Sequence, residues 1–194
     1  MLRPRLRWLV TLLAASALIG GKPVASPSNK QVTKPSKVVI RQNRLAESLK
    51  TWNRLKAKHG DHYRYEIHGG FYLGWGSITT IIVQDGKVVA RTYEEGQTDN
   101  EGELMVEEQY SWTEKGAGVG SHEGSGAAPR TVDELYKECR DDVLTRNPRT
   151  NDIYLDVGND GVLINCLYAP EGYAVDAAPG VSINALEFLP TKND

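Results

Sequence analysis

Four histidines are the first side chains in this sequence that could bind a metal ion: His59, His62, His68 and His122. A zinc site needs ligands that converge on one point in tetrahedral geometry. His59 and His62 flank the end of a predicted helix, and His68 lies farther along a predicted strand, a separation of about 20 Å. Because this spacing keeps the histidines apart, we predict solvated side chains and no metal site.

A glycine-rich segment is the second candidate. Residues 114–130 read EKGAGVGSHEGSGAAPR, and loops that bind phosphate are also rich in glycine. A P-loop, however, follows the pattern GxxxxGKS or GxxxxGKT, and a dinucleotide site requires a βαβ unit. The segment has neither feature, so we predict a long mobile surface loop and no cofactor.

Nucleophilic catalysis is the third possibility, because Ser121, His122, Glu123 and Ser125 lie close together in the same segment. A catalytic triad is assembled from side chains that rigid elements bring together, whereas these four belong to one loop. The segment also lacks the GxSxG pattern between a strand and a helix. We therefore predict that the chain is not an enzyme, with a hydrolase or a metal-dependent enzyme as the alternative.

Three aromatic residues, Phe71, Tyr72 and Trp75, lie in the glycine-broken stretch FYLGWG. Exposed aromatic side chains are typical anchors of binding surfaces. The interpretation that we favour is that they fold back over an open sheet face and complete the core, because a single sheet layer must be covered; contact with a partner is the alternative. These three residues are our candidates for contact with a partner.

The two cysteines of the sequence, Cys139 and Cys166, are candidates for a disulfide. Such a bond persists in an oxidising compartment, and the chain-entropy argument gives it about 3–4 kcal/mol for a loop of this length. The alternative is two reduced cysteines that behave as small buried hydrophobes. The sequence leaves both states open.

Two helices are predicted to position these residues. The first covers residues 40–60, where apolar side chains recur every three or four positions and charged residues cover the other side. The second covers residues 131–146, where Thr131 and Glu134 have the spacing of a capping box and Cys139 lies on the apolar stripe. The apolar face of the first helix consists of Leu45, Leu49, Trp52 and Leu55.

The clearest strand signal is SITTIIVQDGKVVARTY at residues 77–93, where two β-branched runs flank an Asp-Gly pair. Asp-Gly is the strongest short hairpin signal, and a second such pair lies at residues 160–161. Residues 104–112 are predicted as a further strand. Because short connections favour antiparallel pairing, we predict an α+β domain with two helices packed on one face of a largely antiparallel sheet of about six strands.

The beginning of the chain indicates export. A basic start, an uncharged apolar run at residues 8–20 and small residues after it form the pattern of a secretory signal peptide. We predict a signal peptide over residues 1–25, a flexible linker over residues 26–37 and a single domain over residues 38–194. The alternative is an uncleaved anchor, although the apolar run is shorter than the about 20 residues that span a membrane.

The charge of the remaining chain limits its partners. Residues 1–25 hold four of the 23 Lys and Arg residues and none of the 25 Asp and Glu residues, so the rest carries a net charge of −6. An acidic domain lacks the basic surface of a nucleic-acid-binding protein and the basic stripe of a membrane-surface binder. We predict no nucleic acid and no stable membrane insertion after signal cleavage.

Several motifs, in order along the chain, resemble a family of bacterial exported proteins of unknown function. Trp52 in a helix precedes the strand Tyr63-Arg64-Tyr65. The hairpin VQDGKV, the helix start TVDELY, the Asp-Gly pair at 160–161 and Phe188 follow. The resemblance covers about residues 45–190 and implies an exported α+β domain, without implying any activity.

These observations favour an exported, non-catalytic binding or accessory domain of the cell envelope, in the periplasm or outside the cell. Its partner would be another envelope or extracellular protein. A purely structural envelope protein is a further alternative. The hairpin at residues 77–93 is then a scaffold, and the loops beside it form the contact surface.

Overall fold

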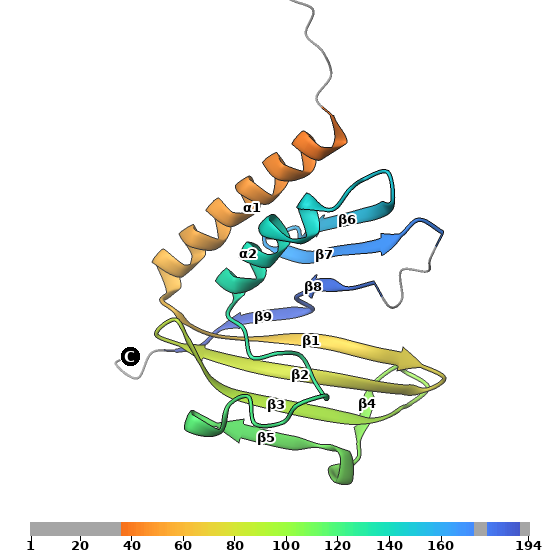
Figure 1. The fold of residues 1–194 in the computed structure, drawn as a ribbon. Helices are drawn as coiled ribbons and strands as arrows, with labels where there is room; N and C mark the ends of the chain where they lie inside the picture. Colours follow the sequence, from red (N-terminus) through yellow and green to blue (C-terminus); the bar gives the residue numbers. More distant parts are fainter. Residues whose placement is uncertain (1–35, 173–177, 191–194) are drawn as a thin grey trace, which may run out of the picture. The chain divides into compact units, whose positions relative to one another are not determined.

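The computed structural model describes residues 36–172 and 178–190, with the backbone alone for Phe71 and Tyr72 (Figure 1). The predicted signal peptide, and the predicted linker up to residue 35, lie outside the described residues. None of the helices in residues 36–172 and 178–190 contains an apolar stretch of the length that a membrane span requires.

Helix α1 (Lys37–His59) begins three residues before the predicted start, because Ser36 acts as its N-cap. The Ser36 side chain accepts a hydrogen bond from the backbone N–H of Val39, which satisfies one of the donors left free at a helix start. The apolar face follows the predicted spacing, with Leu45 and Trp52 buried in the core.

Five strands form the main path of the large sheet, in the order β4-β3-β2-β1-β9, and β5 pairs with β3 beside β4. Every pair of neighbours is antiparallel, so the predicted α+β class with a largely antiparallel sheet of six strands is confirmed. The bounds are β1 (His62–Tyr72), β2 (Trp75–Gln84), β3 (Lys87–Thr98), β4 (Leu104–Val106), β5 (Trp112–Lys115) and β9 (Ala185–Phe188).

The turn between β2 and β3 explains why the chain reverses there. Asp85 and Gly86 both have positive φ, 52° and 70°, which is the geometry of a type I′ hairpin turn. The predicted strand at residues 104–112, in contrast, is divided. A short 3₁₀ helix, η1 (Glu108–Tyr110), separates β4 from β5, so the two pieces pair with different parts of β3.

Helix α2 (Val132–Asp141) starts with the predicted capping box, in which Thr131 and Glu134 satisfy each other's backbone N–H groups. It is shorter than predicted, since residues Val143–Thr145 form a separate 3₁₀ turn, η3. The predicted loop at residues 114–130 begins later, because Glu114 and Lys115 belong to β5. The glycine-rich segment of the structure therefore starts at Gly116, with another 3₁₀ turn, η2 (Gly116–Gly118). Helix α2 is amphipathic, and its apolar side chains are buried.

A second, three-stranded antiparallel sheet was not foreseen by the sequence analysis. It consists of β6 (Asn151–Val157), β7 (Leu163–Pro170) and β8 (Gly180–Ser182). The chain then passes directly from β8 to β9 and so from the small sheet to the large one (Figure 1). The backbone N–H of Asn184 donates to the carbonyl of Glu66, 2.8 Å away, which links this passage to β1.

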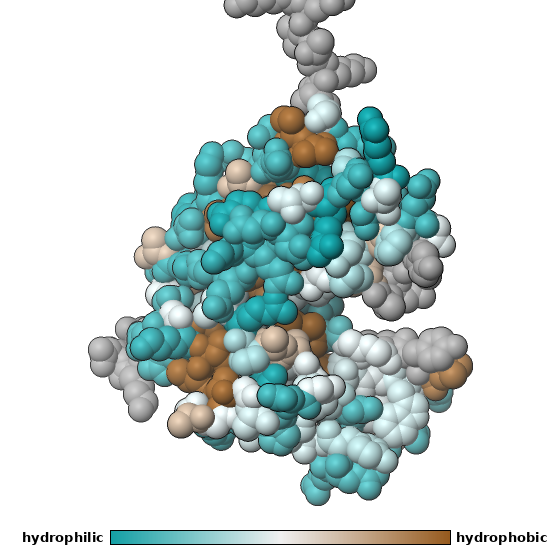
Figure 2. Space-filling view, in the orientation of Figure 1, coloured by the Kyte–Doolittle hydropathy of each residue, from teal (hydrophilic) through white to brown (hydrophobic). Residues whose placement is uncertain are grey.

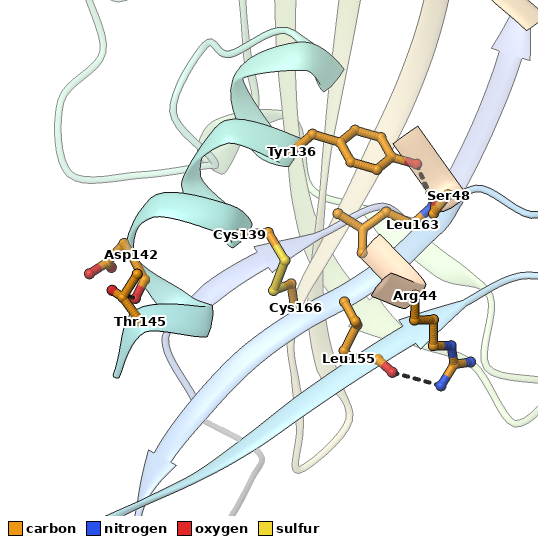
Figure 3. Close-up of a disulfide and its surroundings, with 9 residues drawn as sticks. All are labelled: Arg44, Ser48, Tyr136, Cys139, Asp142, Thr145, Leu155, Leu163 and Cys166. Atoms are coloured by element: carbon orange, nitrogen blue, oxygen red, sulfur yellow. Dashed lines mark hydrogen bonds between the residues drawn. A yellow bond between two sulfur atoms is a disulfide. The ribbon is translucent and has the colours of Figure 1, made fainter. Parts of the chain in front are cut away.

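The core lies between the two helices, the small sheet and the part of the large sheet that the helices cover. The ring of Trp52 packs edge-on against Tyr63, with ring centroids 5.0 Å apart, and stacks on Phe188 at 5.8 Å. The structure joins Cys139 of α2 to Cys166 of β7 in a disulfide, with their Cα atoms 5.6 Å apart (Figure 3). The sequence left the state of the two cysteines open, and their distance in the structure supports the bonded pair, which ties helix α2 to the small sheet.

Candidate functional site

One face of the large sheet packs against the core under the helices and extends past the helices toward the glycine-rich segment. We call this whole face the inner face. In β2 this face presents Ser77, Thr79 and Ile81. Ile81 is buried under the helices, whereas Thr79 accepts a hydrogen bond from the backbone of Ala127 at 3.0 Å. The inner face is therefore covered by helices at one end and by the glycine-rich segment at the other.

A buried ion pair lies under the glycine-rich segment. Arg91 of β3 and Glu114 of β5 are register partners on the inner face, and they are only 3 % and 4 % exposed. Arg91 Nε donates to Glu114 Oε2 at 2.9 Å, and a terminal nitrogen donates to Oε1 at 3.0 Å. This two-pronged arrangement is the strongest geometry for an Arg–carboxylate pair.

The same two side chains hold the loop through its backbone. Glu114 accepts hydrogen bonds from the N–H groups of Gly120 and His122 and from the hydroxyl of Ser121. Arg91 donates to the carbonyls of His122 at 2.8 Å and Ala127 at 2.9 Å. The Arg91 guanidinium and the backbone donors keep the pKa of the Glu114 carboxyl far below its usual range.

An aromatic stack covers the ion pair. The Trp112 ring lies parallel to the His122 ring, with centroids 4.4 Å apart, and stacks on Tyr93 at 5.5 Å. The Arg91 guanidinium lies 4.5 Å from the centroid of Trp112, a cation–π contact. The indole N–H donates to the hydroxyl of Ser125 at 3.0 Å, so Trp112 also binds the loop.

Gly126 shows how closely the loop approaches the inner face. It has a positive φ of 72°, and a Cβ placed on it would lie within 3.0–3.2 Å of Tyr93, Thr79 and Trp112. Glycine is therefore required here by both the backbone conformation and the lack of space. The glycine-rich composition, which predicts mobility, also permits this close packing; the mobility of the loop stays a prediction.

A groove of about 460 Å³ opens on the inner face beside the loop. Figure 2 shows that this end of the molecule has a pale surface, neither strongly hydrophilic nor hydrophobic, whereas hydrophilic surface dominates over the helices. Hydroxyl groups, glycine backbone and one carboxylate line the groove. Its polar side chains are Ser77, Thr79, Tyr93, Glu95 and Ser125.

Tyr93 and Glu95 form the polar end of this groove. The Tyr93 hydroxyl donates to Glu95 Oε2 at 2.7 Å. Burial of the ring and this contact with a carboxylate raise the pKa of Tyr93, so the phenol keeps its proton and remains a donor. Ser77 lies directly opposite Glu95 in the sheet register.

The aromatic candidates lie at the far end of the β1–β2 hairpin. Trp75 is partly exposed, and its ring packs edge-on against Tyr110, with centroids 6.1 Å apart. The neighbouring Leu73 is 83 % exposed and Tyr110 is 49 % exposed. The side chains of Phe71 and Tyr72 lie outside the described parts. Trp75 thus belongs to a partly exposed aromatic pair rather than to the buried core.

The four histidines do not come together. His59 stacks on Phe188, with centroids 5.0 Å apart, and His62 contacts the carbonyl of Pro190 at 3.1 Å. His68 pairs with Glu66 on β1, and His122 lies against Glu114. Among the described residues, no group of three or more metal-ligating side chains is found.

The Ser-His-Glu grouping of the loop takes an arrangement that the sequence did not indicate. Ser121 and His122 both contact Glu114, with His122 Nδ1 3.0 Å from Oε1, whereas Ser125 contacts Trp112. Because Glu114 is already paired with Arg91, these contacts hold the loop in place. Sequence reasoning missed Arg91 and Glu114; the alternation in WTEK, which places Trp112 and Glu114 on one face, is the signal that could have found them.

Comparison with protein-family profiles, curated proteins and solved structures finds no match to this chain. The resemblance to exported bacterial proteins of unknown function therefore stays an expectation from sequence motifs. The candidate site must be interpreted from its own geometry.

Proposed function

We propose that this protein is an exported, non-catalytic binding domain of the cell envelope. Its contact surface is the inner-face groove together with the Trp75–Tyr110 pair at the end of the hairpin. The observation that carries this proposal is the groove itself, whose wall is a loop held by the buried Arg91–Glu114 pair.

A preformed recess favours binding, because little conformational entropy is lost when a ligand enters it. The hydrogen bonds from Glu114 and Arg91 to the loop supply this preorganisation. Hydroxyls and glycine backbone offer directional hydrogen bonds to a polar ligand, and the partly exposed aromatic pair offers apolar contact area.

Export is supported by two independent features. The first is the basic and apolar pattern of residues 1–25. The second is the disulfide between Cys139 and Cys166, since structural disulfides persist in oxidising compartments outside the cytosol. A partner is therefore expected among envelope or extracellular proteins.

Site-specific cross-linking in cells tests the proposal. A photo-crosslinking amino acid replaces Ser77, which lines the groove, and in a control chain it replaces Thr80, which lies three residues along the same strand on the opposite face. We expect a defined cross-linked species from position 77 alone. The same species should weaken with Trp75→Ala, while the thermal midpoint of that variant stays close to the wild-type value.

Positions 77 and 80 lie on opposite faces of β2, so comparing them separates binding in the groove from non-specific contact. Equal cross-linking from positions 77 and 80, or none from position 77, would contradict binding through the groove. Loss of thermal stability in Trp75→Ala together with loss of cross-linking would assign Trp75 to the core instead.

A further inference from the structure

The groove has a single charged side chain in its lining, the carboxylate of Glu95. One oxygen, Oε2, accepts the hydrogen bond from Tyr93 at 2.7 Å. No described residue donates a hydrogen bond to the other oxygen, Oε1. The carboxylate is thus oriented by a neutral phenol and keeps an acceptor available to a ligand.

The segment that follows Arg91 along one side of the groove is acidic. Residues 92–111 contain seven acidic residues and no Lys, Arg or His. None of the seven forms an ion pair with another residue of the described ranges. The adjoining Arg91 is neutralised by Glu114. Clefts lined by one sign of charge concentrate ions of the opposite sign.

One aromatic ring lines the groove beside this carboxylate, and an aromatic pair lies farther along the same face. Tyr93 lines the groove with Glu95, and Trp75 lies two residues from Ser77 on the same face of β2, against Tyr110. Aromatic faces attract ammonium and guanidinium groups through the ring quadrupole. The carboxylate in the groove therefore favours a cation over an anion, and the partly exposed Trp75–Tyr110 pair offers a further contact to it.

We propose that the groove binds a cationic group, an alkylammonium or a guanidinium, whose N–H donors reach Glu95 Oε1 beside Ser77 and Tyr93. This assignment rests on the proposed binding function and names its ligand class. A lysine or arginine side chain of a partner polypeptide and a free polyamine share this chemistry.

Titration with two cationic probes tests the assignment. Acetylated, amidated tetralysine represents the peptide source and spermidine the polyamine source, with tetraglutamate as the anionic control. Amide resonances of the exported protein are followed in two-dimensional NMR spectra. We expect tetralysine or spermidine to shift the resonances of Ser77, Glu95 and Ser125. The probe that binds with the higher affinity identifies the source of the cationic group, a polypeptide or a polyamine. If neither probe shifts these resonances, the proposal is overturned.

Two neighbouring carboxylates provide the matched comparison. Glu95→Gln retains the size of the side chain and an acceptor for Tyr93 but removes the charge, and should lower the affinity about tenfold, since hydrogen bonds to charged groups are the stronger ones. Glu94 pairs with Ile78 on the opposite face, so Glu94→Gln should change the affinity less than about twofold, as expected for a screened surface charge. Equal losses in both variants would show attraction to the acidic surface alone and overturn the site.

A second variant keeps the test informative if Glu95→Gln does not fold. Ser77→Lys introduces an ammonium directly opposite Glu95, and it should abolish the tetralysine shifts through competition for the same carboxylate. Shifts that persist in a folded Ser77→Lys chain would contradict the proposal.

The cross-linking experiment separates this inference from the proposed function. A partner captured at position 77 with undiminished yield in Glu95→Gln leaves the binding function intact and removes the cationic ligand class. Capture that fails at position 77 removes the binding function itself.

Discussion

The two ends of the inner face are stabilised in different ways. Under the helices, the core is apolar and contains the Cys139–Cys166 disulfide (Figure 3). Under the glycine-rich loop, the buried groups are the Arg91–Glu114 ion pair and its hydrogen bonds to the loop backbone. One sheet therefore supports an apolar core and a polar one.

The difference follows from what each covering segment offers. Helix α2 presents a stripe of apolar side chains, which are stabilised by leaving water and need no directional partners. The loop at residues 116–127 is mostly small residues and has little apolar surface to bury, so its N–H and C=O groups must be bound one by one. Directional bonds fix the loop while leaving a groove open beside it.

Hydrogen bonds between polar side chains also occur at the apolar end. The Tyr136 hydroxyl lies 2.7 Å from that of Ser48 and accepts from the backbone N–H of Leu163 at 3.0 Å (Figure 3). Lys56 donates to both oxygens of Asp133, at 2.7 and 2.8 Å. These bonds connect the helices with each other and with β7, but they leave the core predominantly apolar.

Breaking the ion pair should have the largest effect. Arg91→Met leaves the Glu114 carboxylate buried without its counter-charge, and removing one partner of a buried pair costs about 3–5 kcal/mol. We expect a fall of this size in the free energy of unfolding, measured by urea denaturation. Hydrogen exchange should increase more in residues 116–127 than in α2; equal increases in both would contradict a distinct polar core.

The double variant Arg91→Met/Glu114→Leu sharpens the comparison, since two apolar residues often replace a buried ion pair at little cost. Here the loop donors of Gly120, Ser121 and His122 also lose their acceptor. Recovery of the wild-type stability would show that these loop contacts contribute little.

Removing the disulfide should have the second largest effect, at the end of the inner face that lies under the helices. Replacing both cysteines by alanine opens a loop with a sequence separation of 27 residues, which lowers the free energy of unfolding by about 3–4 kcal/mol in the chain-entropy argument. We expect faster hydrogen exchange in α2 and β7 with little change in residues 116–127. Wild-type protein measured with a reductant is the matched control, and faster exchange in the loop would contradict the separation of the two ends.

Acid should weaken the loop end with the smallest effect, because no atom is removed: the folded state keeps the Glu114 carboxylate charged, and only the unfolded chain takes up the proton. The pKa of Glu114 is lowered in the folded state from its ordinary value of 4.5. Its contribution is therefore fully present above about pH 4.5 and decreases as the pH falls below it. Between pH 6 and pH 3 the free energy of unfolding should fall less in Glu114→Gln than in the wild type, as measured by urea denaturation; equal falls would contradict this assignment.

The elements with local signals could be predicted from the sequence. The Asp85-Gly86 turn, the Thr131–Glu134 capping box and the apolar spacing of α1 each depend on neighbours a few residues apart, and all three are present in the structure. The disulfide was left open because cysteine spacing says nothing about the distance between Cα atoms.

The second sheet could not be predicted in the same way. Strands β6, β7 and β8 have ordinary strand patterns, and which sheet they join depends on contacts with distant elements. The two residues between β8 and β9 decide this division. The backbone N–H of Ile183 donates to a carbonyl of β7, and that of Asn184 donates to a carbonyl of β1, so β8 and β9 belong to different sheets. No local pattern in these residues indicates that division.

The sequence by itself determined the individual helices and hairpins, and with them the α+β class, because capping, turn geometry and side-chain periodicity act over a few residues. Only the tertiary structure decided what the glycine-rich segment does. Arg91 and Glu114 lie 23 residues apart, and the pairing of β5 with β3 makes them partners. The groove exists because that pair binds a loop which has too few apolar side chains to pack by itself.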